Sequence, residues 1–456
     1  MKNLSLKEIA KAVGGIEPAD IIISEIFTDS RKKAVNGLFF AIKGDRFDGH
    51  DFINEAGKNG AAAVVCHKEI KTNLPVIMVA DTKKAYLQLG GYYRGLFDIP
   101  FVALTGSAGK TTTKDMVHAV LSAKYRTLKT EGNLNNEIGV PATLFRVDEK
   151  TEAAVIEMGM NHAGEISPLS KAVKPDAAVI TNIGAAHIEN LKSREGILKA
   201  KLEILDGMDN SSPVILNGDD KYLKNAPVGR RKAVFYALEN NKADIKASAI
   251  TQSDSEIRFS VETDGEKKEV ALPAVGVHNV YNALAAIAAG KLLGVGLKDA
   301  AEALKNYAPP AMRQNIEKIN GITIINDCYN SNPDSVKAAL NALSAIPGNR
   351  KIAVLGDMLE LGEYSAEAHE QSGAYAAETG AKAIFTFGKC SEKTAEAAKN
   401  HGITDVFDFI DIDEITAALT GYIKEGDAVL FKASRGMKIE RVIDNLQFRP
   451  RNSQLM

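Results

Sequence analysis

Apolar and polar positions alternate along the chain in two patterns. Short apolar runs of strand length are separated by stretches in which apolar residues recur every three or four positions, the spacing of an amphipathic helix. In residues 1 to 98 this alternation predicts a small α/β domain. Its expected strands are 21–23, 38–42, 61–66 and 76–79, and its expected helices are 52–59 and 82–96.

From residue 99 the same alternation continues with longer elements, which is typical of a parallel sheet flanked by helices. Between about 230 and 272 the apolar runs become short and closely spaced, which predicts an antiparallel edge on that sheet. Two helical stretches follow, and the second ends at Pro309 and Pro310. We place a domain boundary there, because a proline pair ends a helix. The expected strands are 101–104, 153–156, 177–180, 214–216, 233–237, 257–261 and 269–272.

Strand and helix patterns alternate again to the end of the chain and predict a third, Rossmann-like domain. No G-x-G-x-x-G motif follows its first strand, so a dinucleotide site has no support. The fold class we expect is therefore α/β with three domains: a small N-terminal domain (1–98), a central P-loop ATPase domain with a parallel sheet (99–312) and a C-terminal Rossmann-like domain (313–456).

The stretch FVALTGSAGKTTT, residues 101–113, combines a strand, a glycine-rich turn and the start of a helix. Glycines let backbone N–H groups surround an anion, the helix N-terminus adds partial positive charge, and a lysine can reach the outer phosphates. The strict G-x-x-x-x-G-K-[ST] spacing is not met, because Leu104 stands at its first position. The order of features still predicts nucleotide triphosphate binding. The residues expected to bind the nucleotide here are Thr105, Gly106, Ser107, Ala108, Gly109, Lys110, Thr111 and Thr112.

Polar residues follow several of the predicted strands, at the sheet edge where ligands of open α/β sheets bind. Glu157 comes after 153–156 and is well placed to hold Mg²⁺ opposite the phosphate loop. His187 comes after 177–180 and could ligate a metal, although a lone histidine is more often a cap or packing residue. Asn135 and Asn136 lie in an Asn-rich stretch that would ordinarily be a solvated loop.

Composition narrows the classes of partner. The chain has 56 basic and 58 acidic residues, and no basic cluster suggests a nucleic-acid site. Three scattered cysteines argue against a disulfide framework and a cysteine zinc site, and they fit a reducing cytoplasm. No apolar run is long enough to cross a membrane, and the first residues form an amphipathic pattern rather than a signal peptide. We expect a cytoplasmic protein without membrane insertion, and a monomer.

Taken together, the motifs resemble those of the Mur ligases, the ATP-dependent amide-forming enzymes of peptidoglycan precursor synthesis. The resemblance runs through all three domains. TGSAGKTTTK, GNLNNEIGVP, IEMGMN, TNIGAAH and GVHNVYN are similar to the shared ATPase core, while DCYNSNPDS and LGDMLELG are similar to the members that add D-alanyl-D-alanine to UDP-N-acetylmuramoyl-tripeptide. A D-N-P-R type motif, expected in members that add a diamino acid to the UDP-dipeptide, is not found in the sequence.

This resemblance implies a mechanism with ATP and Mg²⁺ as cofactors. A substrate carboxylate takes the γ-phosphoryl group of ATP, and the amine of the dipeptide then displaces phosphate from the acyl phosphate. Lys110, Glu157, His187 and Lys201 would carry the chemistry. By resemblance, Thr111 and Glu157 would hold one Mg²⁺, and His187 with a carbamylated Lys201 would serve a second. From its position alone, Lys201 reads as an ordinary charged residue on the surface of a helix.

The resemblance assigns the remaining polar residues to three ligands. Asn135 and Asn136 would help position the nucleotide or the acyl phosphate, and Asn279, Arg313 and Asn330 are candidates for the base and ribose of ATP. Residues expected to face D-alanyl-D-alanine are Asp327, Asn332, Asp357, Lys432 and Ser434. Residues expected to form the UDP-sugar platform are Asp29, Ser30, Arg31, Asp48, Gly49 and His50.

Three alternative functions stay open on the sequence. A ligase of the same family that adds a diamino acid is the nearest, and a folylpolyglutamate synthetase is disfavoured by the N-terminal domain. A P-loop switch or transport ATPase would hydrolyse ATP without an acceptor amine and leaves the third domain unexplained. With three domains contributing to one site, we expect the C-terminal domain to close before chemistry and to exclude water.

Overall fold

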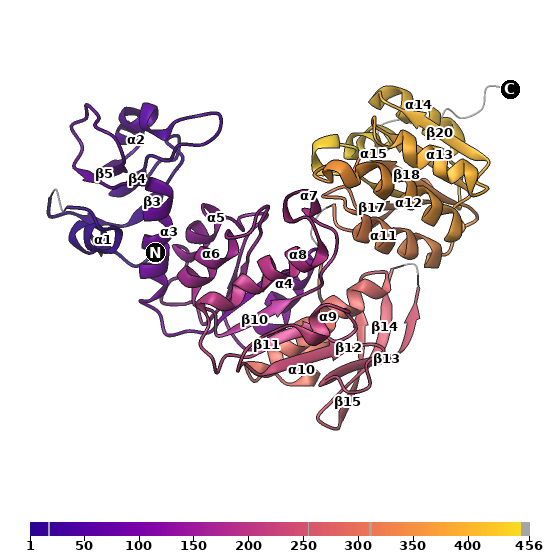
Figure 1. Ribbon diagram of the computed structural model, residues 1–456, viewed down its shortest axis with the longest axis horizontal. Coiled ribbons are helices and arrows are strands. Elements are labelled where there is room, and N and C mark those ends of the chain that lie inside the picture. Colours follow the sequence, from indigo (N-terminus) through magenta and orange to yellow (C-terminus); the bar gives the residue numbers. More distant parts are fainter. Residues whose placement is uncertain (17–18, 254, 310–311, 448–456) are drawn as a thin grey trace.

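The computed structural model describes residues 1–16, 19–253, 255–309 and 312–447. It consists of three α/β domains that follow one another along the chain and form an open arc (Figure 1). The N-terminal domain lies at one end, the C-terminal domain at the other, and the central domain joins them. Pro310, half of the proline pair expected to end the central domain, lies outside the described residues.

The N-terminal domain is built on a four-stranded parallel sheet in the order β3-β4-β5-β6. The strands are β3 (Glu25–Phe27), β4 (Gly37–Phe40), β5 (Ala61–Cys66) and β6 (Val76–Met78), and a two-stranded ribbon of β1 (Leu4–Ser5) and β2 (Ile22–Ile23) lies beside them. The helices are α1 (Leu6–Val13), α2 (Ile53–Lys58) and α3 (Thr82–Arg94).

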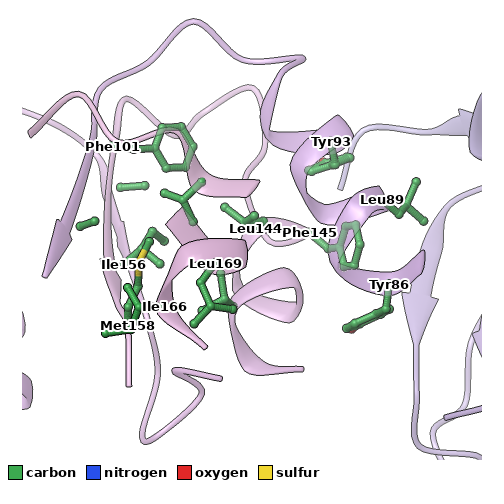
Figure 2. Close-up of a cluster of buried hydrophobic side chains, with 14 of the residues drawn as sticks. Tyr86, Leu89, Tyr93, Phe101, Leu144, Phe145, Ile156, Met158, Ile166 and Leu169 are labelled. Carbon is green, nitrogen blue, oxygen red and sulfur yellow. The ribbon is translucent and has the colours of Figure 1, made fainter. Parts of the chain in front are cut away.

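Helix α3 connects the N-terminal and central domains through one continuous apolar core. Figure 2 shows Tyr86, Leu89 and Tyr93 on α3 beside Leu144 and Phe145 of the central domain. The Tyr93 hydroxyl donates a hydrogen bond of 2.7 Å to the backbone carbonyl of residue 147, so its polar end is satisfied inside this core. Because burial of several aromatic rings is shared across the junction, these two domains are held together firmly.

The central domain contains a nine-stranded sheet in the order β15-β14-β13-β12-β11-β10-β7-β9-β8. The strands at 101–105, 153–157 and 177–180 are nearly continuous apolar runs, as expected for strands buried on both faces. Its strands are β7 (Phe101–Thr105), β8 (Thr127–Lys129), β9 (Ala153–Glu157), β10 (Ala177–Ile180), β11 (Val214–Asn217), β12 (Ala233–Ala237), β13 (Ile245–Gln252), β14 (Ile257–Thr263) and β15 (Glu266–Leu272). Its helices are α4 (Lys110–Ser122), α5 (Gly139–Leu144), α6 (Ile166–Val173), α7 (Ile188–Leu191), α8 (Arg194–Leu202), α9 (Val277–Leu292) and α10 (Leu297–Lys305).

The antiparallel edge expected between residues 230 and 272 is shorter than predicted. Strands β13, β14 and β15 pair antiparallel, but β12 pairs parallel with both β11 and β13. The reason lies in the connections, because antiparallel neighbours are joined by tight turns and parallel ones need a longer return of the chain. Short turns join β13 to β14 and β14 to β15, whereas the 3-10 helix η3 (Leu223–Asn225) lies in the longer segment between β11 and β12.

The C-terminal domain has a six-stranded sheet in the order β16-β17-β21-β18-β19-β20, parallel except for the edge strand β16. Its strands are β16 (Asn315–Ile319), β17 (Ile322–Asn326), β18 (Lys351–Gly356), β19 (Ala383–Phe387), β20 (Asp405–Phe409) and β21 (Ala428–Lys432). Its helices are α11 (Pro333–Ala345), α12 (Ser365–Glu378), α13 (Glu392–Asn400), α14 (Ile412–Tyr422) and α15 (Glu440–Gln447). Among the described residues, no helix is both long and apolar enough to span a bilayer.

Candidate active site

The glycine-rich loop between β7 and α4 has the geometry of an anion cradle. Gly109 has φ +76° directly before helix α4, and a side chain there would lie 2.7 Å from the Oδ1 atom of Asn282. The Lys110 ammonium group folds back and donates a hydrogen bond of 2.8 Å to the carbonyl of Gly106. Burial lowers the pKa of Lys110, Glu157 opposes this shift, and Arg313 adds to it. The loop therefore holds a cation at the N-terminus of a helix, where an anion would be favoured.

This loop forms one wall of a cleft of about 490 Å³ between the central and C-terminal domains. Most of the residues that the sequence singled out in these two domains line the cleft. Those lining it are Ser107, Ala108, Gly109, Lys110, Thr111, Thr112, Asn135, Glu157, His187, Asn279, Arg313, Asp327, Asn330, Asn332 and Lys432. Ser434 lines a smaller adjoining pocket of about 120 Å³, which also includes Lys110 and His187.

Glu157, at the end of β9, is the centre of a small oxygen-rich cluster. Its carboxylate accepts hydrogen bonds of 3.0 Å from the Thr111 hydroxyl and 2.9 Å from the Asn135 amide. The buried ammonium group of Lys114 lies 3.8 Å away and keeps positive charge beside it. A carboxylate next to a hydroxyl is a donor set suited to Mg²⁺, which is usually held by one or two carboxylates, water and substrate phosphates.

His187 stands directly before helix α7 with a left-handed backbone, φ +61°. Its buried Nδ1 atom makes no hydrogen bond and lies 3.3 Å from a carboxylate oxygen of Glu360, which belongs to the C-terminal domain. Burial, followed by the positive charges of Lys110 and Lys201, lowers the pKa of His187 to about 4. The imidazole is therefore neutral near pH 7, the form that can ligate a metal.

Lys201 is buried, with 1 % of its surface exposed, although its position on α8 suggested a surface residue. Burial and the nearby charge of Lys110 lower its pKa well below the usual lysine value. Within the described part of the chain, no group of three or more His, Cys, Asp and Glu side chains is arranged to hold a metal ion. Besides Glu157 and His187, a metal here would therefore need donors such as the Thr111 hydroxyl, an altered Lys201 or oxygens of the substrate.

The opposite wall of the cleft comes from the C-terminal domain. The buried Lys432 ammonium group donates hydrogen bonds of 2.7 Å to the Asp327 carboxylate and 2.9 Å to the Asn330 carbonyl. The Arg313 guanidinium lies 3.9 Å from the centroid of the Tyr329 ring, which holds it flat against the wall by a cation–π contact. This wall thus offers one matched pair of opposite charges and one half-buried planar cation, Arg313.

Five of the expected residues in these two domains do not line the cleft or the adjoining pocket. Asn136 lies just before helix α5, where its side chain accepts hydrogen bonds from the backbone N–H groups of residues 138 and 139. The buried Asp357 carboxylate accepts hydrogen bonds from the backbone and hydroxyl of Ser391. The other three, Thr105, Gly106 and Lys201, are buried.

The six expected residues of the N-terminal domain lie outside the cleft and form two clusters. Asp29 and Arg31 pair with each other at the surface, and Ser30 donates a hydrogen bond of 2.9 Å to Glu55. In the second cluster, the Asp48 carboxylate accepts from the backbone N–H of His50 and contacts its ring nitrogen at 2.6 Å. Gly49 is required between them, since a Cβ atom there would lie 2.7 Å from the backbone nitrogen of residue 42.

Several cleft residues were not assigned a role from the sequence. Most of them are polar residues whose partners are distant in the chain, so no local pattern identifies them; Asn282 is one helical turn from Asn279. Asn282 accepts a hydrogen bond of 3.1 Å from Thr113 and donates one of 3.1 Å to Asn279, and Gln314 accepts from Asn279 at 3.0 Å. Those without an earlier assignment include Asn182, Tyr281, Asn282, His278, Gln314 and Glu360.

Comparison with known protein families gives three matches that together cover most of the chain. The family model described as "Mur ligase family, catalytic domain" matches residues 22–87. "Mur ligase middle domain" matches residues 104–290, and "Mur ligase, glutamate ligase domain" matches residues 312–435.

Individual proteins are similar over the full length. The UDP-N-acetylmuramoyl-tripeptide--D-alanyl-D-alanine ligase of Bacillus subtilis (strain 168) is 40% identical over an alignment of 456 positions, which covers 98% of this chain and 99% of that protein. A crystal structure of MurF from Acinetobacter baumannii has a TM-score of 0.92 at 32% identity, covering 98% of this chain and 100% of that one. A MurF ligase from Thermotoga maritima in complex with ADP has a TM-score of 0.85 at 30% identity, covering 93% of this chain and 97% of that one.

Proposed function

The chain belongs to the Mur ligase family, and we propose that it joins D-alanyl-D-alanine to UDP-N-acetylmuramoyl-tripeptide at the expense of ATP. The observation that carries this proposal is one cleft with two different walls. One wall is the phosphate loop of the central domain, and the other is formed by residues of the DCYNSNPDS stretch and Lys432. The relative from Bacillus subtilis, named for this reaction, matches both halves of the site.

The phosphate loop and Lys110 would hold the triphosphate of ATP, as supported by the ADP complex of the Thermotoga maritima relative. In phosphoryl transfer the protein contributes mostly positioning and charge neutralisation. Lys110 would release the Gly106 carbonyl and turn to the outer phosphates, where it offsets the charge that builds up as the γ-phosphoryl group moves to the substrate carboxylate. Asn279, Arg313 and Asn330 would then line the base and ribose.

Mg²⁺ is the proposed companion of the nucleotide, held by Thr111 and Glu157. When bound, it would neutralise phosphate charge during transfer. A second Mg²⁺ would need an oxygen donor near His187, and Lys201 could become one by reaction with CO₂. That reaction requires a neutral amine, and burial, which lowers the pKa of Lys201, favours that form over the ammonium. The carbamate would carry a negative charge where the unmodified ammonium would repel the metal.

We propose that the C-terminal wall receives the dipeptide. Asp327 and Lys432 are available to the ammonium and carboxylate ends of the incoming zwitterion, with Asn332 and Ser434 beside them. Asp357 would act through its contact with Ser391 rather than directly.

The N-terminal clusters, Asp29 to Arg31 and Asp48 to His50, would hold the UDP-sugar, and Asn135 with Asn136 would position the nucleotide or the acyl phosphate. Domain boundaries near residues 98 and 312 are part of the same proposal.

The test is acceptor-dependent release of phosphate. Purified protein is incubated with ATP, Mg²⁺ and UDP-N-acetylmuramoyl-tripeptide, with or without D-alanyl-D-alanine. Phosphate release is measured, and the UDP-linked product is identified by mass spectrometry. We expect phosphate and UDP-pentapeptide only when the dipeptide is present. A parallel reaction supplies the UDP-dipeptide with free diamino acids, and turnover there alone would assign the chain to that reaction instead. Phosphate release that needs no acceptor would refute the ligase proposal.

A further inference from the structure

The segment Thr181 to Lys192 follows strand β10 and carries His187 into the cleft. Its first two residues brace the phosphate loop through four hydrogen bonds. The Thr181 hydroxyl and the Asn182 amide both donate to the carbonyl of Ala108, at 2.7 and 3.0 Å. In return, the backbone N–H of Ala108 donates to the Asn182 side chain and that of Ser107 to the Asn182 carbonyl. Movement of this segment would therefore move the phosphate loop.

The same segment is held from the C-terminal domain by Asp334, in the first turn of helix α11. One oxygen of the Asp334 carboxylate accepts a hydrogen bond of 2.7 Å from the backbone N–H of Ala185. The other oxygen lies 3.5 Å from the guanidinium of Arg194, which also donates to the carbonyl of Ile183. A single carboxylate of the C-terminal domain thus contacts the segment two residues before His187.

Helix α7, which follows His187, completes this contact. Figure 1 shows α7 on the side of the central domain that faces the C-terminal domain, and α7 packs against the 3-10 helix η4 (Gly362–Tyr364). The Tyr364 hydroxyl donates a hydrogen bond of 3.1 Å to the carbonyl of Lys192. His187 and Lys192, on either side of α7, both have left-handed backbones, with φ +61° and +66°. Such conformations are costly for residues other than glycine and persist where the surroundings hold them.

We propose that Asp334 is a positioning residue for the ligase reaction. By accepting the Ala185 N–H, it fixes the segment that both braces the phosphate loop and presents His187. The seating of the domain that receives the acceptor would thereby set the geometry of phosphoryl transfer. This role rests on the proposed function, because it concerns a reaction in which both domains take part.

A purely local role for Asp334 is the alternative. Aspartate is favoured in the first turn of any helix, where it interacts with the helix dipole. Asp413 provides a matched control, because it occupies the same second position of helix α14 in the same domain. Asp413 is exposed, and its backbone N–H bonds to Asp411 within the same domain. Loss of the Asp413 carboxylate tests the helix-dipole contribution without touching the central domain.

The experiment compares Asp334→Ala, Asp334→Asn and Asp413→Ala in the full chain by hydrogen exchange, steady-state kinetics and binding of ADP. In Asp334→Ala we expect faster exchange of the amides in residues 183–192. We also expect kcat to fall by roughly tenfold, the scale of a lost hydrogen bond to a charged group, and the Kd for ADP to rise because the segment braces the phosphate loop less firmly. Asp334→Asn keeps an acceptor oxygen and should restore the protection and most of kcat. Asp413→Ala should behave as the unaltered protein in all three measurements.

Three outcomes would overturn the proposal. Unchanged exchange in Asp334→Ala would show that the contact does not hold the segment, whatever reaction the protein catalyses. Faster exchange with kcat within about twofold of the unaltered protein would show that the contact is made but does not position the reaction. If Asp334→Ala fails to fold, Asp334→Asn tests the proposal instead. A roughly tenfold loss of kcat in Asp334→Asn, with the amides of residues 183–192 still protected from exchange, would contradict the role of the hydrogen bond. Absence of acceptor-dependent turnover in the unaltered protein would refute the proposed function alone, since the exchange comparison is independent of it.

Discussion

Replacing Lys110 with methionine should separate function from stability at the centre of the cleft. Methionine has nearly the length and volume of lysine without its charge, so the substitution removes the ammonium and leaves the packing of the stem. Lys110 is held by one hydrogen bond to the neutral carbonyl of Gly106. Its lowered pKa shows that burial outweighs the attraction of Glu157 in the free protein.

These terms give a small change in folding free energy. Loss of the hydrogen bond should cost about 1 kcal/mol. Relief from burying an ammonium group acts in the opposite direction and is worth up to several kcal/mol when the group is fully dry. Because Lys110 retains partial exposure to the cleft, we expect only part of that relief. The Lys110→Met variant should therefore melt within about 3 °C of the unaltered protein.

The effect on activity should be much larger. One group that stabilises charge in a transition state contributes about 2.7–4 kcal/mol, which corresponds to a loss of roughly 10² to 10³ in kcat. Lys110→Arg should not restore it, because the guanidinium is broader than an ammonium group and its donors are fixed in a plane. The carbonyl oxygen of Gly106 lies 2.8 Å from the ammonium nitrogen of Lys110, which leaves little space for the larger guanidinium group.

The assay is acceptor-dependent phosphate release under saturating ATP and D-alanyl-D-alanine, with thermal unfolding followed by circular dichroism on the same samples. Lys84→Met on helix α3 of the N-terminal domain serves as the control for loss of a lysine charge. A loss of less than about tenfold in kcat would show that Lys110 does not meet the transferring phosphoryl group. A melting temperature lowered by much more than expected would show that Lys110 is needed for the fold.

Three further predictions concern other parts of the chain. Asp427→Ala breaks the pair with Arg350, whose guanidinium donates two hydrogen bonds of 2.9 and 2.6 Å to a carboxylate that is 1% exposed. Unfolding in urea should show a free energy of unfolding lower by about 3 kcal/mol. An unchanged urea midpoint would contradict this. Burial lowers the pKa of His278, so the unfolded chain binds more protons than the folded one below pH about 6.5, and stability falls on acidification. Between about pH 7 and pH 5, the melting temperature of His278→Gln should therefore fall less than that of the unaltered protein. Parallel curves of melting temperature against pH for the two proteins would contradict this. Gly49→Ala forces a Cβ atom against the backbone of Ile42 and should raise KM for the UDP-substrate at an unchanged Kd for ADP; equal effects on both ligands would argue against a separate UDP-sugar platform.

The features that could be predicted from the sequence are those set by neighbours in the chain. The phosphate loop is one, because its glycines, Lys110 and the helix start are consecutive, and the structure has β7 ending at Thr105 and α4 beginning at Lys110. Buried parallel strands are another, since continuous apolar runs distinguish them. Strand β20 gives a weaker signal, because its residues are mostly half exposed and its pattern, DVFDF, lacks a continuous apolar run.

Which polar residues face the cleft could not be predicted in the same way. Asn135 and Asn136 are adjacent in an Asn-rich loop, yet one contacts Glu157 and the other accepts a hydrogen bond from the first residue of helix α5. Asp327 and Asp357 both follow strands of the C-terminal sheet, but a serine thirty-four residues further along the chain takes up the Asp357 carboxylate. Such choices depend on hydrogen-bond partners that only the fold brings together, so sequence position limits the candidates without deciding among them.

The charges of the two cleft walls differ in a way that fits their proposed ligands. On the phosphate wall, the Lys110 ammonium donates to the neutral carbonyl of Gly106, and burial lowers its pKa more than Glu157 raises it. Such an arrangement is costly while the site lacks an anion and becomes favourable when phosphate oxygens enter. On the other wall, the part assigned to the dipeptide carries Lys432 matched by Asp327 at 2.7 Å, so that part is close to neutral. A neutral pair suits a zwitterionic dipeptide, which brings one charge of each sign and adds no net charge. We therefore infer that the nucleotide wall selects its ligand by net charge and the dipeptide wall by the placement of opposite charges.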